Sequence, residues 1–358
     1  TPTCCANTAL TLNQQGVASM TSFPLPDFPS LRHMGRRRMF ITGGTGFLGR
    51  SLLDHLATIA PRYWPDLQVE VLSRDPSTFL RRFPQYANQR WLSFVEGSLD
   101  RLPKSQGYTD LIHGAAETHW NGDKLTWMAQ LVDGTRQILE FAREAKVQRL
   151  LFLSSGAVYA PRPDDAPLEE NQPQAPLSTD VSKLYGHGKR MAETLCALYS
   201  AQYSVPSVIA RCFAVVSEHV PLDGPYAVGN FLRDALDPLR PAIVVRGTGQ
   251  AVRTYIDGRD MARWLLTMLD HGTPGTAYNV GGDKPITTLA LAGMVMRVVS
   301  PCKPLQVERQ VEAFSQLDRS VYIPSVERAR SLGLVARVSL EESIAEVANK
   351  LRHIMQNS

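Results

Sequence analysis

The sequence has little of what a membrane protein, a nucleic-acid binder or a disulfide-stabilised protein requires. No run of 18 apolar residues occurs, so no segment is expected to span a membrane. The formal net charge of +4 is too small for a dedicated nucleic-acid binder, in which a basic stripe dominates. The hydrophobic share of 44% and the charged share of 20% are typical of a soluble globular protein.

Cysteine is also scarce. The five cysteines are Cys4, Cys5, Cys196, Cys212 and Cys302. They form no C-x-x-C pair, and their odd count and irregular spacing predict free thiols in a reducing compartment, which favours the cytoplasm. His113 and His119 bracket the end of a predicted strand, but no third ligand accompanies them. We therefore predict no metal site.

The first 38 residues differ in character from the rest of the chain. They contain four prolines and many small polar residues, and they end in three consecutive arginines at positions 36–38. The arginines follow a polar stretch, whereas a secretory signal places its positive charge before an apolar one. We expect a poorly ordered leader at residues 1–38, and we favour it over a targeting peptide or a basic contact patch.

From residue 39 onward, short apolar runs alternate with stretches of helical periodicity. The predicted strands are 39–42, 68–73, 91–95, 110–115, 149–154 and 207–216, and the predicted helices between them are 47–59, 125–145 and 181–203. This alternation predicts a parallel sheet covered by helices on both faces. After residue 217, prolines and shorter elements follow.

The expected fold class is therefore α/β, with two lobes. A Rossmann-type doubly wound parallel sheet is predicted at residues 39–216, and a smaller mixed α/β carboxy-terminal substrate lobe at residues 217–358. Elements of the two lobes are allowed to interleave. In the second lobe we predict helices near 230 and at 259–269, 289–299, 325–332 and 339–354, and strands at 243–246 and 277–280.

A glycine-rich turn joins the first predicted strand to the first predicted helix. Gly43, Gly44, Gly46 and Gly49 satisfy both G-x-G-x-x-G and G-x-x-G-x-x-G. Glycine lets the backbone approach a pyrophosphate closely, and the start of the helix offers unpaired N–H groups to the anion. In this strand–turn–helix context the motif predicts a bound dinucleotide, the alternative being a tight turn without a ligand.

The end of the second predicted strand bears on which dinucleotide binds. NAD sites usually present an acid here to the ribose, whereas an arginine accommodates the 2′-phosphate of NADP. Ser73 holds the register position of the acid and Arg74 follows it, which favours NADP(H). NAD(H) remains the alternative, because a shift of one residue would place Asp75 at the ribose and leave Arg74 as a solvated loop residue.

Three further residues suggest proton and hydride chemistry. Tyr185 and Lys189 are four residues apart in a predicted helix and so share a face. A phenol has a pKa near 10, and a nearby ammonium is expected to lower it. Tyr185 would then exchange a proton with a substrate oxygen while hydride moves at the neighbouring carbon. Ser155, at the carboxyl end of a predicted strand, is the expected hydroxyl that holds this oxygen.

With these residues in place, the chain from Met39 to Leu351 resembles an extended short-chain dehydrogenase/reductase of the nucleotide-sugar epimerase/dehydratase type. The matching motifs are the glycine turn, 110–116, Gly134-Thr135, Ser155, Tyr185-x-x-x-Lys189 with Glu193, Arg211-x-Phe213, 230–232, Gly247-x-Gly249-Gln250-x-x-Arg253, Asp260 and 278–281. The resemblance implies a homodimer formed through the helices 125–145 and 181–203.

Together with the motifs above, the resemblance implies three groups of site residues. The catalytic residues are Ser155, Tyr185 and Lys189. The cofactor-binding residues are Gly43, Gly46, Phe47, Leu48, Gly49, Ser73, Arg74, Ser98, Leu99, Ala115, Ala116, Thr118, Tyr185, Lys189 and Phe213. The substrate-binding residues are Glu117, Ser155, Gly156, Ala214, Asn230 and Arg253. Arg253 suits a nucleotide diphosphate, because a guanidinium binds phosphate through a planar fork.

Departures from the family pattern narrow the expected reaction. Gly156 and Ala157 follow Ser155 where the 4,6-dehydratases carry an acid pair that eliminates water, so dehydration is not expected. Leu131 and Ala214 replace asparagines that are usual in the family, which indicates a sugar pose unlike that of a typical 4-epimerase.

The favoured hypothesis is an NADPH-dependent reductase of a nucleotide-linked 4-keto-6-deoxy sugar, with hydride from the nicotinamide and the proton from Tyr185. The alternative is an NAD-dependent nucleotide-sugar 4-epimerase that keeps its NAD bound. A third hypothesis is a non-catalytic dinucleotide-sensing protein, which the intact Tyr185, Lys189 and Ser155 disfavour. The expected partner is a nucleotide-sugar substrate, with no nucleic acid and no membrane.

Overall fold

The computed structural model describes residues 37–104, 107–118, 120–160, 162, 164–308 and 321–356. Residues 1–36 of the predicted leader lie outside the described residues. The strands are β1 (Arg38–Thr42), β2 (Gln68–Ser73), β3 (Leu92–Glu96), β4 (Asp110–His113), β5 (Arg149–Ser155), β6 (Ser207–Cys212), β7 (Ala214–Val216), β8 (Ile243–Arg246), β9 (Val252–Arg253), β10 (Tyr255–Asp257), β11 (Ala277–Val280), β12 (Ile286–Thr287), β13 (Leu305–Glu308) and β14 (Val321–Tyr322). The α-helices are α1 (Phe47–Tyr63), α2 (Pro76–Arg82), α3 (Lys124–Ala145), α4 (Leu184–Tyr203), α5 (Ala227–Leu236), α6 (Gly258–His271), α7 (Thr288–Val299), α8 (Glu327–Arg330) and α9 (Leu340–Gln356), and the short 3-10 helices are η2 (Pro84–Tyr86), η3 (Gly156–Val158) and η4 (Val181–Lys183).

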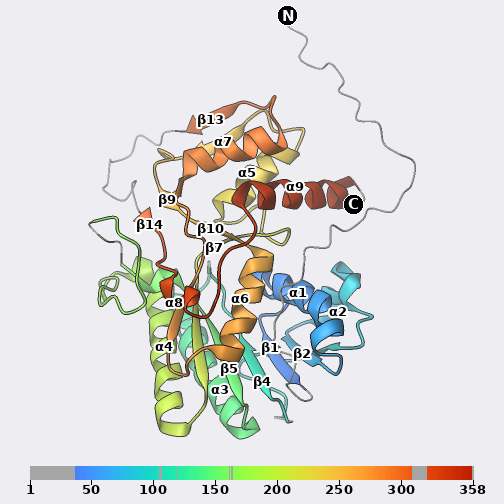
Figure 1. Ribbon diagram of the computed structural model, residues 1–358, viewed down its shortest axis with the longest axis vertical. Coiled ribbons are helices and arrows are strands. Elements are labelled where there is room, and N and C mark those ends of the chain that lie inside the picture. Colours follow the sequence, from blue (N-terminus) through green and yellow to red (C-terminus); the bar gives the residue numbers. More distant parts are fainter. Residues whose placement is uncertain are drawn as a thin grey trace, which may run out of the picture.

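A seven-stranded sheet forms the centre of the larger lobe (Figure 1). Its strand order is β11-β6-β5-β4-β1-β2-β3, and every neighbouring pair is parallel. The chain moves outward from β1 to β3 and then returns to β4 on the other side of β1. This order confirms the predicted Rossmann-type doubly wound sheet, and it places the reversal between β1 and β4, where open α/β sheets bind ligands.

Helices cover both faces of this sheet because alternate strand residues point to opposite sides. In β1, Met39 and Ile41 enter the core that contains α1 and α6, whereas Phe40 enters the core that contains α3 and α4. All three side chains are buried. Among the helices of the described ranges, none has the length and apolarity needed to cross a lipid bilayer.

The second lobe gathers at one end of the molecule, where α5, α7 and α9 lie together (Figure 1). These helices and β8 enclose a separate core that includes Phe231, Leu291 and Ile344. Two segments of the predicted second lobe, α6 and β11, lie on the first lobe instead, since β11 pairs with β6 and α6 packs against α1. The strand predicted at 207–216 is two strands, because β7 leaves the main sheet and pairs with β10.

The last two arginines of the predicted leader belong to the fold. Arg38 begins β1, and the Arg37 guanidinium is buried between two carboxylates. It donates to Asp110 at 3.0 and 3.1 Å and to Asp270 at 2.8 and 3.2 Å. Arg149 also contacts Asp110, so two cations and two anions share this buried site at the amino end of the sheet. Arg37 thus ties β1 to β4 and to the end of α6.

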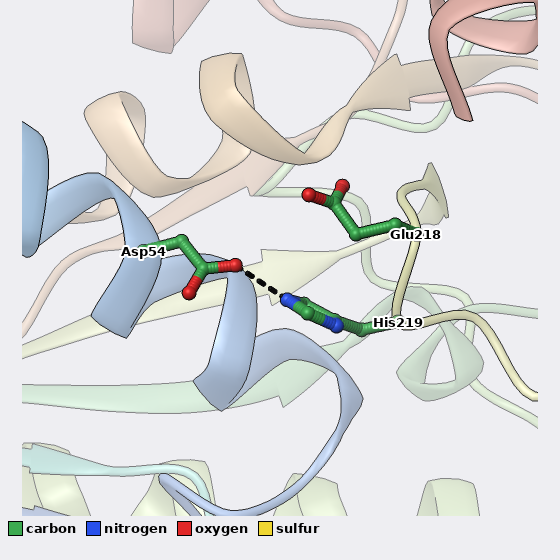
Figure 2. A group of neighbouring side chains, drawn as sticks. All are labelled: Asp54, Glu218 and His219. Carbon is green, nitrogen blue, oxygen red and sulfur yellow. Dashed lines mark hydrogen bonds and ion pairs between the residues drawn. The ribbon is translucent and has the colours of Figure 1, made fainter. Parts of the chain in front are cut away.

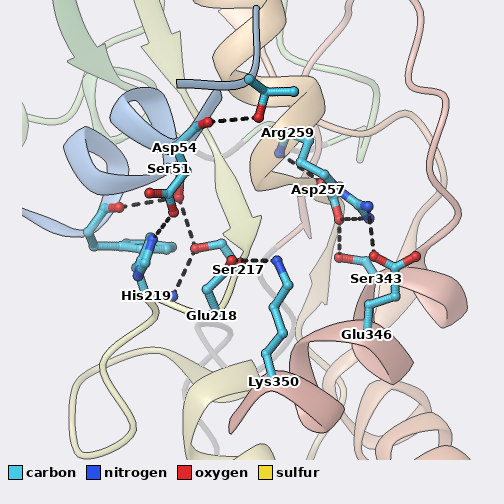
Figure 3. A network of polar contacts seen from close by, with 12 residues as sticks. Ser51, Asp54, Ser217, Glu218, His219, Asp257, Arg259, Ser343, Glu346 and Lys350 are labelled. Atoms are coloured by element: carbon cyan, nitrogen blue, oxygen red, sulfur yellow. Dashed lines mark hydrogen bonds and ion pairs between the residues drawn. The ribbon is translucent and has the colours of Figure 1, made fainter. Parts of the chain in front are cut away.

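A polar network joins the two lobes (Figure 3). The Ser51 hydroxyl of α1 donates to the Ser217 hydroxyl at 3.0 Å. His219 lies 2.5 Å from a carboxylate oxygen of Asp54, which is also on α1. The segment that leaves β7 is therefore held against α1, the helix that begins at the glycine turn. This arrangement fixes the position of the second lobe relative to that turn.

Candidate active site

Two adjoining cavities follow the carboxyl ends of the central strands. Their volumes are about 620 and 670 Å³, within the range of small-molecule sites. Residues from β1, from the glycine turn and from the segment after β4 line both, namely Thr42, Gly43, Gly46, Gly114, Ala116 and Glu117. The first cavity extends to the ends of β2 and β3, and the second extends to α4 and the second lobe. Together they form one elongated cleft at the point where the strand order reverses.

Backbone atoms of the glycine turn line this cleft. Gly43 has a φ of +76°, which favours glycine, and a Cβ there would lie 2.4 Å from the carbonyl carbon of Gly114. A Cβ on Gly49 would lie 2.2 Å from the carbonyl oxygen of Gly43. No side chain of the described residues caps α1 at Gly46, so the first-turn N–H groups of α1 are left to a ligand. These features fit the pyrophosphate of a dinucleotide.

The end of β2 places Arg74 in the first cavity and Asp75 away from it. Ser73 and Arg74 line this cavity, whereas Asp75 caps α2, accepting a hydrogen bond from the Thr78 N–H at 2.9 Å. The Arg74 guanidinium forms an ion pair with Glu117 at 3.1 Å across the cavity. The Arg74 side chain is 77% exposed, so it is accessible to a ligand in the cleft.

The three predicted catalytic residues meet in the second cavity. Ser155 ends β5, and Tyr185 and Lys189 lie on α4. The Lys189 ammonium donates to the Leu153 carbonyl at 2.7 Å and lies 6.0 Å from the centre of the Tyr185 ring. Burial lowers the pKa of Lys189 to about 8. Trp127 stacks on the Tyr185 ring with centroids 5.9 Å apart, which fixes the plane of the phenol.

The pKa of Tyr185 moves in the opposite direction from the one expected. Burial raises the pKa of Tyr185 above its ordinary value, and hydrogen bonding from Ser155 opposes this rise only in part. The prediction that Lys189 lowers the pKa of Tyr185 is wrong for this structure, because desolvation of the phenolate has the larger effect on this pKa. The Lys189 ammonium is directed instead at the Leu153 carbonyl and the Phe152 ring. At neutral pH Tyr185 therefore holds its proton.

All the predicted cofactor-binding residues line one or both cavities. They are Gly43, Gly46, Phe47, Leu48, Gly49, Ser73, Arg74, Ser98, Leu99, Ala115, Ala116, Thr118, Tyr185, Lys189 and Phe213. Of the predicted substrate-binding residues, Glu117, Ser155, Ala214 and Arg253 line the second cavity. Gly156 and Asn230 line neither. The Asn230 amide donates to the Gly224 carbonyl at 3.1 Å, within its own lobe.

Several aromatic residues in the cleft were missed by the sequence analysis. Tyr226, Tyr255 and Tyr322 line the second cavity, and Trp127 lines the first. The Tyr226 ring meets Phe47 of the glycine turn edge-on, with centroids 5.7 Å apart. The three tyrosines come from the second lobe, where no motif marks them, and only the folded arrangement brings them to the cleft.

A buried charged group supports the strand that ends at Ser155. Arg211 of β6 forms two hydrogen bonds with the Glu193 carboxylate of α4, at 2.9 and 2.7 Å. The Ser154 hydroxyl donates to the same carboxylate at 2.5 Å. These contacts join α4, β5 and β6 directly behind the predicted catalytic residues. The Glu193 and Arg211 motifs therefore have a structural role beside the cavity.

His113 supports the turn after β4. Its Nδ1 lies 2.7 Å from the Thr42 hydroxyl and its Nε2 lies 3.2 Å from the Thr135 hydroxyl. Thr42 in turn accepts the Ala115 N–H at 3.3 Å, which holds the segment that lines both cavities. Burial lowers the pKa of His113 to about 3, so the imidazole is neutral. His119 lies outside the described residues.

One group of side chains has the composition of a metal site. Asp54, Glu218 and His219 place potential ligand atoms within 4.8 Å of one another (Figure 2). Each already has a partner, however: His219 bonds Asp54, the Lys350 ammonium pairs with Glu218 at 2.6 Å, and Arg50 donates to the His219 carbonyl at 3.2 Å. The group lines neither cavity, and its role in this structure is to join the lobes.

Comparison with known proteins indicates the family of this chain. Residues 39–281 match the model of the NAD dependent epimerase/dehydratase family. The chain is 25% identical to dTDP-D-glucose 4,6-dehydratase from Bos taurus over 338 residues, which cover 90% of each protein.

Two solved structures share the fold. A UDP-N-acetylglucosamine 4-epimerase from Methanobrevibacter ruminantium M1 superposes with a TM-score of 0.77 at 19% identity, covering 90% of this chain and all of the other. A UDP-glucuronic acid 4-epimerase from Bacillus cereus, in complex with NAD, gives a TM-score of 0.73 at 20% identity, covering 88% and 99%. The chain therefore belongs to the NAD-dependent epimerase/dehydratase family, whose members are enzymes of the extended short-chain dehydrogenase/reductase type.

Proposed function

We propose that this protein is an NADPH-dependent reductase of a nucleotide-linked 4-keto-6-deoxy sugar. The observation that carries the proposal is the second cavity, in which Ser155, Tyr185 and Lys189 meet and no acid follows Ser155. Gly156 and Ala157 have no ionisable side chain, so the site lacks an acid pair there for eliminating water. Proton exchange at a carbonyl oxygen is the chemistry that the remaining groups support.

Tyr185 is the group that would supply the proton of a reduction. Like an ordinary phenol it is protonated at neutral pH, and it can give this proton to a carbonyl oxygen as hydride reaches the neighbouring carbon. Ser155 donates a hydrogen bond to the same oxygen and holds the carbonyl in place. When bound, the nicotinamide supplies the hydride. Lys189, buried beside the phenol, would bond the ribose of the cofactor.

The first cavity supports a preference for NADP(H). Arg74 lines it and is exposed, so its guanidinium is available to a 2′-phosphate. Asp75, which would serve an NAD ribose, is engaged as the cap of α2. The residues fit a dinucleotide that carries one more phosphate group than NAD.

The position of Arg253 supports the proposal that a nucleotide diphosphate binds at the other end of the cleft. It lines the second cavity, on the side formed by the second lobe. Burial lowers the pKa of Arg253 from its ordinary value, and the group nevertheless stays charged, because arginine does not deprotonate in proteins. Its guanidinium offers a planar fork of N–H donors that suits a diphosphate.

The direct test is turnover of NADPH with a 4-keto-6-deoxy nucleotide sugar, followed by nicotinamide absorbance. Wild-type protein should oxidise NADPH, and Tyr185→Phe should bind NADPH normally but lose nearly all turnover. Tyr203→Phe is a matched control, since Tyr203 lies on the same helix but outside the cavities. Near-normal turnover by Tyr185→Phe would overturn the assignment. Water elimination from a nucleotide-linked glucose would show a dehydratase instead.

A 4-epimerase is the second candidate, and one contact favours it. Arg74 already pairs with Glu117, which would compete with a 2′-phosphate for the guanidinium. An epimerase keeps NAD bound and reuses it in each cycle. Tightly held NAD in the purified protein, with sugar interconversion in the absence of added cofactor, would favour the epimerase over the reductase.

We also propose a cytoplasmic homodimer formed through α3 and α4. Large apolar side chains are exposed on or next to these helices, namely Leu125, Val181, Met191 and Leu198. Burying such a face against a second copy is energetically favourable. The described cysteines Cys196, Cys212 and Cys302 are free thiols, which supports a reducing compartment.

A further inference from the structure

Trp127 contacts both the predicted catalytic tyrosine and the segment that follows β4. It lies near the start of α3, which packs beside α4 (Figure 1). Its indole ring stacks on the Tyr185 ring, with centroids 5.9 Å apart and an angle of 19° between the ring planes. Its indole N–H donates to the Glu117 carbonyl at 2.9 Å. One side chain therefore joins two parts of the cleft.

The start of α3 is anchored by its own cap. The Asp123 carboxylate accepts hydrogen bonds from the Thr126 N–H at 2.7 Å and from the Thr126 hydroxyl at 2.8 Å. The Asp123 carbonyl accepts the Trp127 backbone N–H at 3.1 Å. Such a cap stabilises the first turn of a helix. The backbone of Trp127 is therefore held in place independently of the two contacts that its indole makes.

Tyr185 lies in the first turn of a helix that has no such cap. α4 begins at Leu184, and no side chain of the described residues caps it. The torsion that sets the ring plane of a tyrosine is broad, so neighbouring groups have to fix this plane. Trp127 does so from the other helix. This matters for proton transfer, because a small misplacement of a reacting group lowers the rate strongly.

The second contact of Trp127 holds the segment 114–118, which lines both cavities. The Thr42 hydroxyl accepts the Ala115 N–H at 3.3 Å near the beginning of this segment. Trp127 holds the Glu117 carbonyl toward its end. A segment that is ordered before a ligand arrives costs less entropy when the ligand binds. The indole N–H therefore acts on the affinity for a dinucleotide.

We propose that Trp127 is a positioning residue with two separate effects: its ring face holds the Tyr185 phenol for proton transfer, and its N–H holds the Glu117 carbonyl so that the segment 114–118 is ordered before the cofactor binds. The two effects are separable, because they use different parts of the indole. The effect on turnover rests on the proposed function, since it takes Tyr185 as the proton donor. The effect on affinity requires only that a dinucleotide binds.

Two variants of Trp127 separate these effects. Trp127→Phe keeps a ring face but removes the N–H. It should raise the dissociation constants of NADPH and NADH equally, by about fivefold, the equivalent of one hydrogen bond, and leave kcat within about twofold of the wild type. Trp127→Leu removes both contacts and should also lower kcat about tenfold or more. Calorimetric titration gives the dissociation constants, and nicotinamide absorbance gives kcat.

Trp120→Phe is the matched control. Trp120 also donates its indole N–H to a carbonyl, that of Asp123, at 3.0 Å, but it lines neither cavity. This variant should behave as the wild type in both measurements. A loss that followed the removal of any indole near the start of α3 would therefore appear in the control as well and would overturn the inference.

Three outcomes would contradict the proposed roles. An equal loss of kcat in Trp127→Phe and Trp127→Leu would mean that the ring face does not position Tyr185, and so would an unchanged kcat in Trp127→Leu. An unchanged cofactor affinity in Trp127→Phe would mean that the N–H does not order the segment 114–118.

Melting temperatures test the ring contact without turnover. The losses of melting temperature in Trp127→Leu and Tyr185→Leu should not add in the double variant, because each change removes the same contact. Additive losses would overturn the positioning of Tyr185 while leaving a reductase intact. An absence of wild-type turnover would instead overturn the proposed function, and the dissociation constants and melting temperatures would still decide both contacts of Trp127.

Discussion

The pairing of Arg74 with Glu117 makes cofactor preference the most direct test of the first cavity. Replacing Arg74 with alanine removes the guanidinium that we assign to the 2′-phosphate. Replacing Glu117 with glutamine removes the carboxylate that now holds this guanidinium at 3.1 Å. The two changes should shift NADPH affinity in opposite directions and leave NADH affinity nearly unchanged, since NADH has no 2′-phosphate.

The magnitude follows from two opposing contributions. A hydrogen bond to a charged group contributes about 1.5–3 kcal/mol, whereas an exposed ion pair such as Arg74–Glu117 contributes about 0–1 kcal/mol and must be given up when NADPH binds. The net value of Arg74 is then roughly 1–2 kcal/mol, which corresponds to a factor of about 5–30 in the NADPH dissociation constant. Glu117→Gln should tighten NADPH binding by up to about fivefold.

Intrinsic fluorescence offers a simple assay, because Trp127 lines the first cavity. Titrations with NADPH and NADH, without substrate, give both dissociation constants for each variant. The NADPH preference should fall as salt is added, since exposed charges are screened within about 10 Å at 0.1 M ionic strength. Arg81→Ala is a matched control, because Arg81 is an exposed arginine of α2 that contacts Thr78 and lines neither cavity.

An equal loss of NADPH and NADH affinity in Arg74→Ala would refute the reasoning, since it would mean that the arginine contacts a part common to both cofactors. No change with either cofactor would show that Arg74 is a solvated loop residue. In that case the preference for NADP(H) would have no basis at the end of β2. Tighter wild-type binding of NADH than of NADPH would also contradict it and would favour the epimerase.

Three further predictions concern stability and assembly. The free energy of unfolding should fall as pH drops from about 6.5 toward 3, because unfolded chains protonate His113 near 6.5 while burial lowers its folded pKa to about 3; His113→Gln should flatten this part of the profile. Arg37→Ala should destabilise the protein by about 3–5 kcal/mol in denaturant titration, because it leaves Asp110 and Asp270 buried with less compensation. Leu198→Glu should convert a dimer to a monomer in analytical ultracentrifugation, since Leu198 is exposed on α4.

Each of these predictions has a contrary outcome. An unchanged acid slope in His113→Gln would mean that other groups control acid sensitivity. A loss below about 1 kcal/mol in Arg37→Ala would mean that water or Arg149 compensates the carboxylates. A wild-type monomer, or a dimer that survives Leu198→Glu, would place the interface elsewhere. Leu239→Glu is a control for the last test, because Leu239 is exposed in the other lobe.

The sequence predicts the sheet well because its signals are local. Alternating and helical apolar patterns depend on neighbouring residues, and the glycine turn constrains only the few residues around it. Arg37 is a residue whose environment such local patterns do not predict. In the sequence it belongs to a run of three arginines, but its partners Asp110 and Asp270 are 73 and 233 residues away. The buried ion pair of Arg37 therefore cannot be predicted from the run of arginines, because only folding brings its partners close.

The same distinction applies to the cleft. Ser155, Tyr185 and Lys189 are identified from the sequence because each lies in a recognisable motif. Tyr226 and Tyr322 lie in none, and they reach the cavity through the packing of the second lobe. The pKa of Tyr185 could not be predicted from spacing either, because desolvation depends on the whole pocket, and here it outweighs the neighbouring ammonium.

Gly156 shows that a position without a side chain can still be filled in the structure. In the sequence, Gly156 stands where the 4,6-dehydratases carry an acid. In the structure, the hydroxyl of Tyr322 lies 2.1 Å from the position of the missing Cβ, so a side chain from a distant segment fills the space beside Gly156. Restoring an acid at position 156 alone would drive its Cβ into that phenol. The side-chain chemistry at this position is therefore set jointly by Gly156 and Tyr322, and the space that the phenol fills supports our proposal against dehydration as much as the lacking acid does.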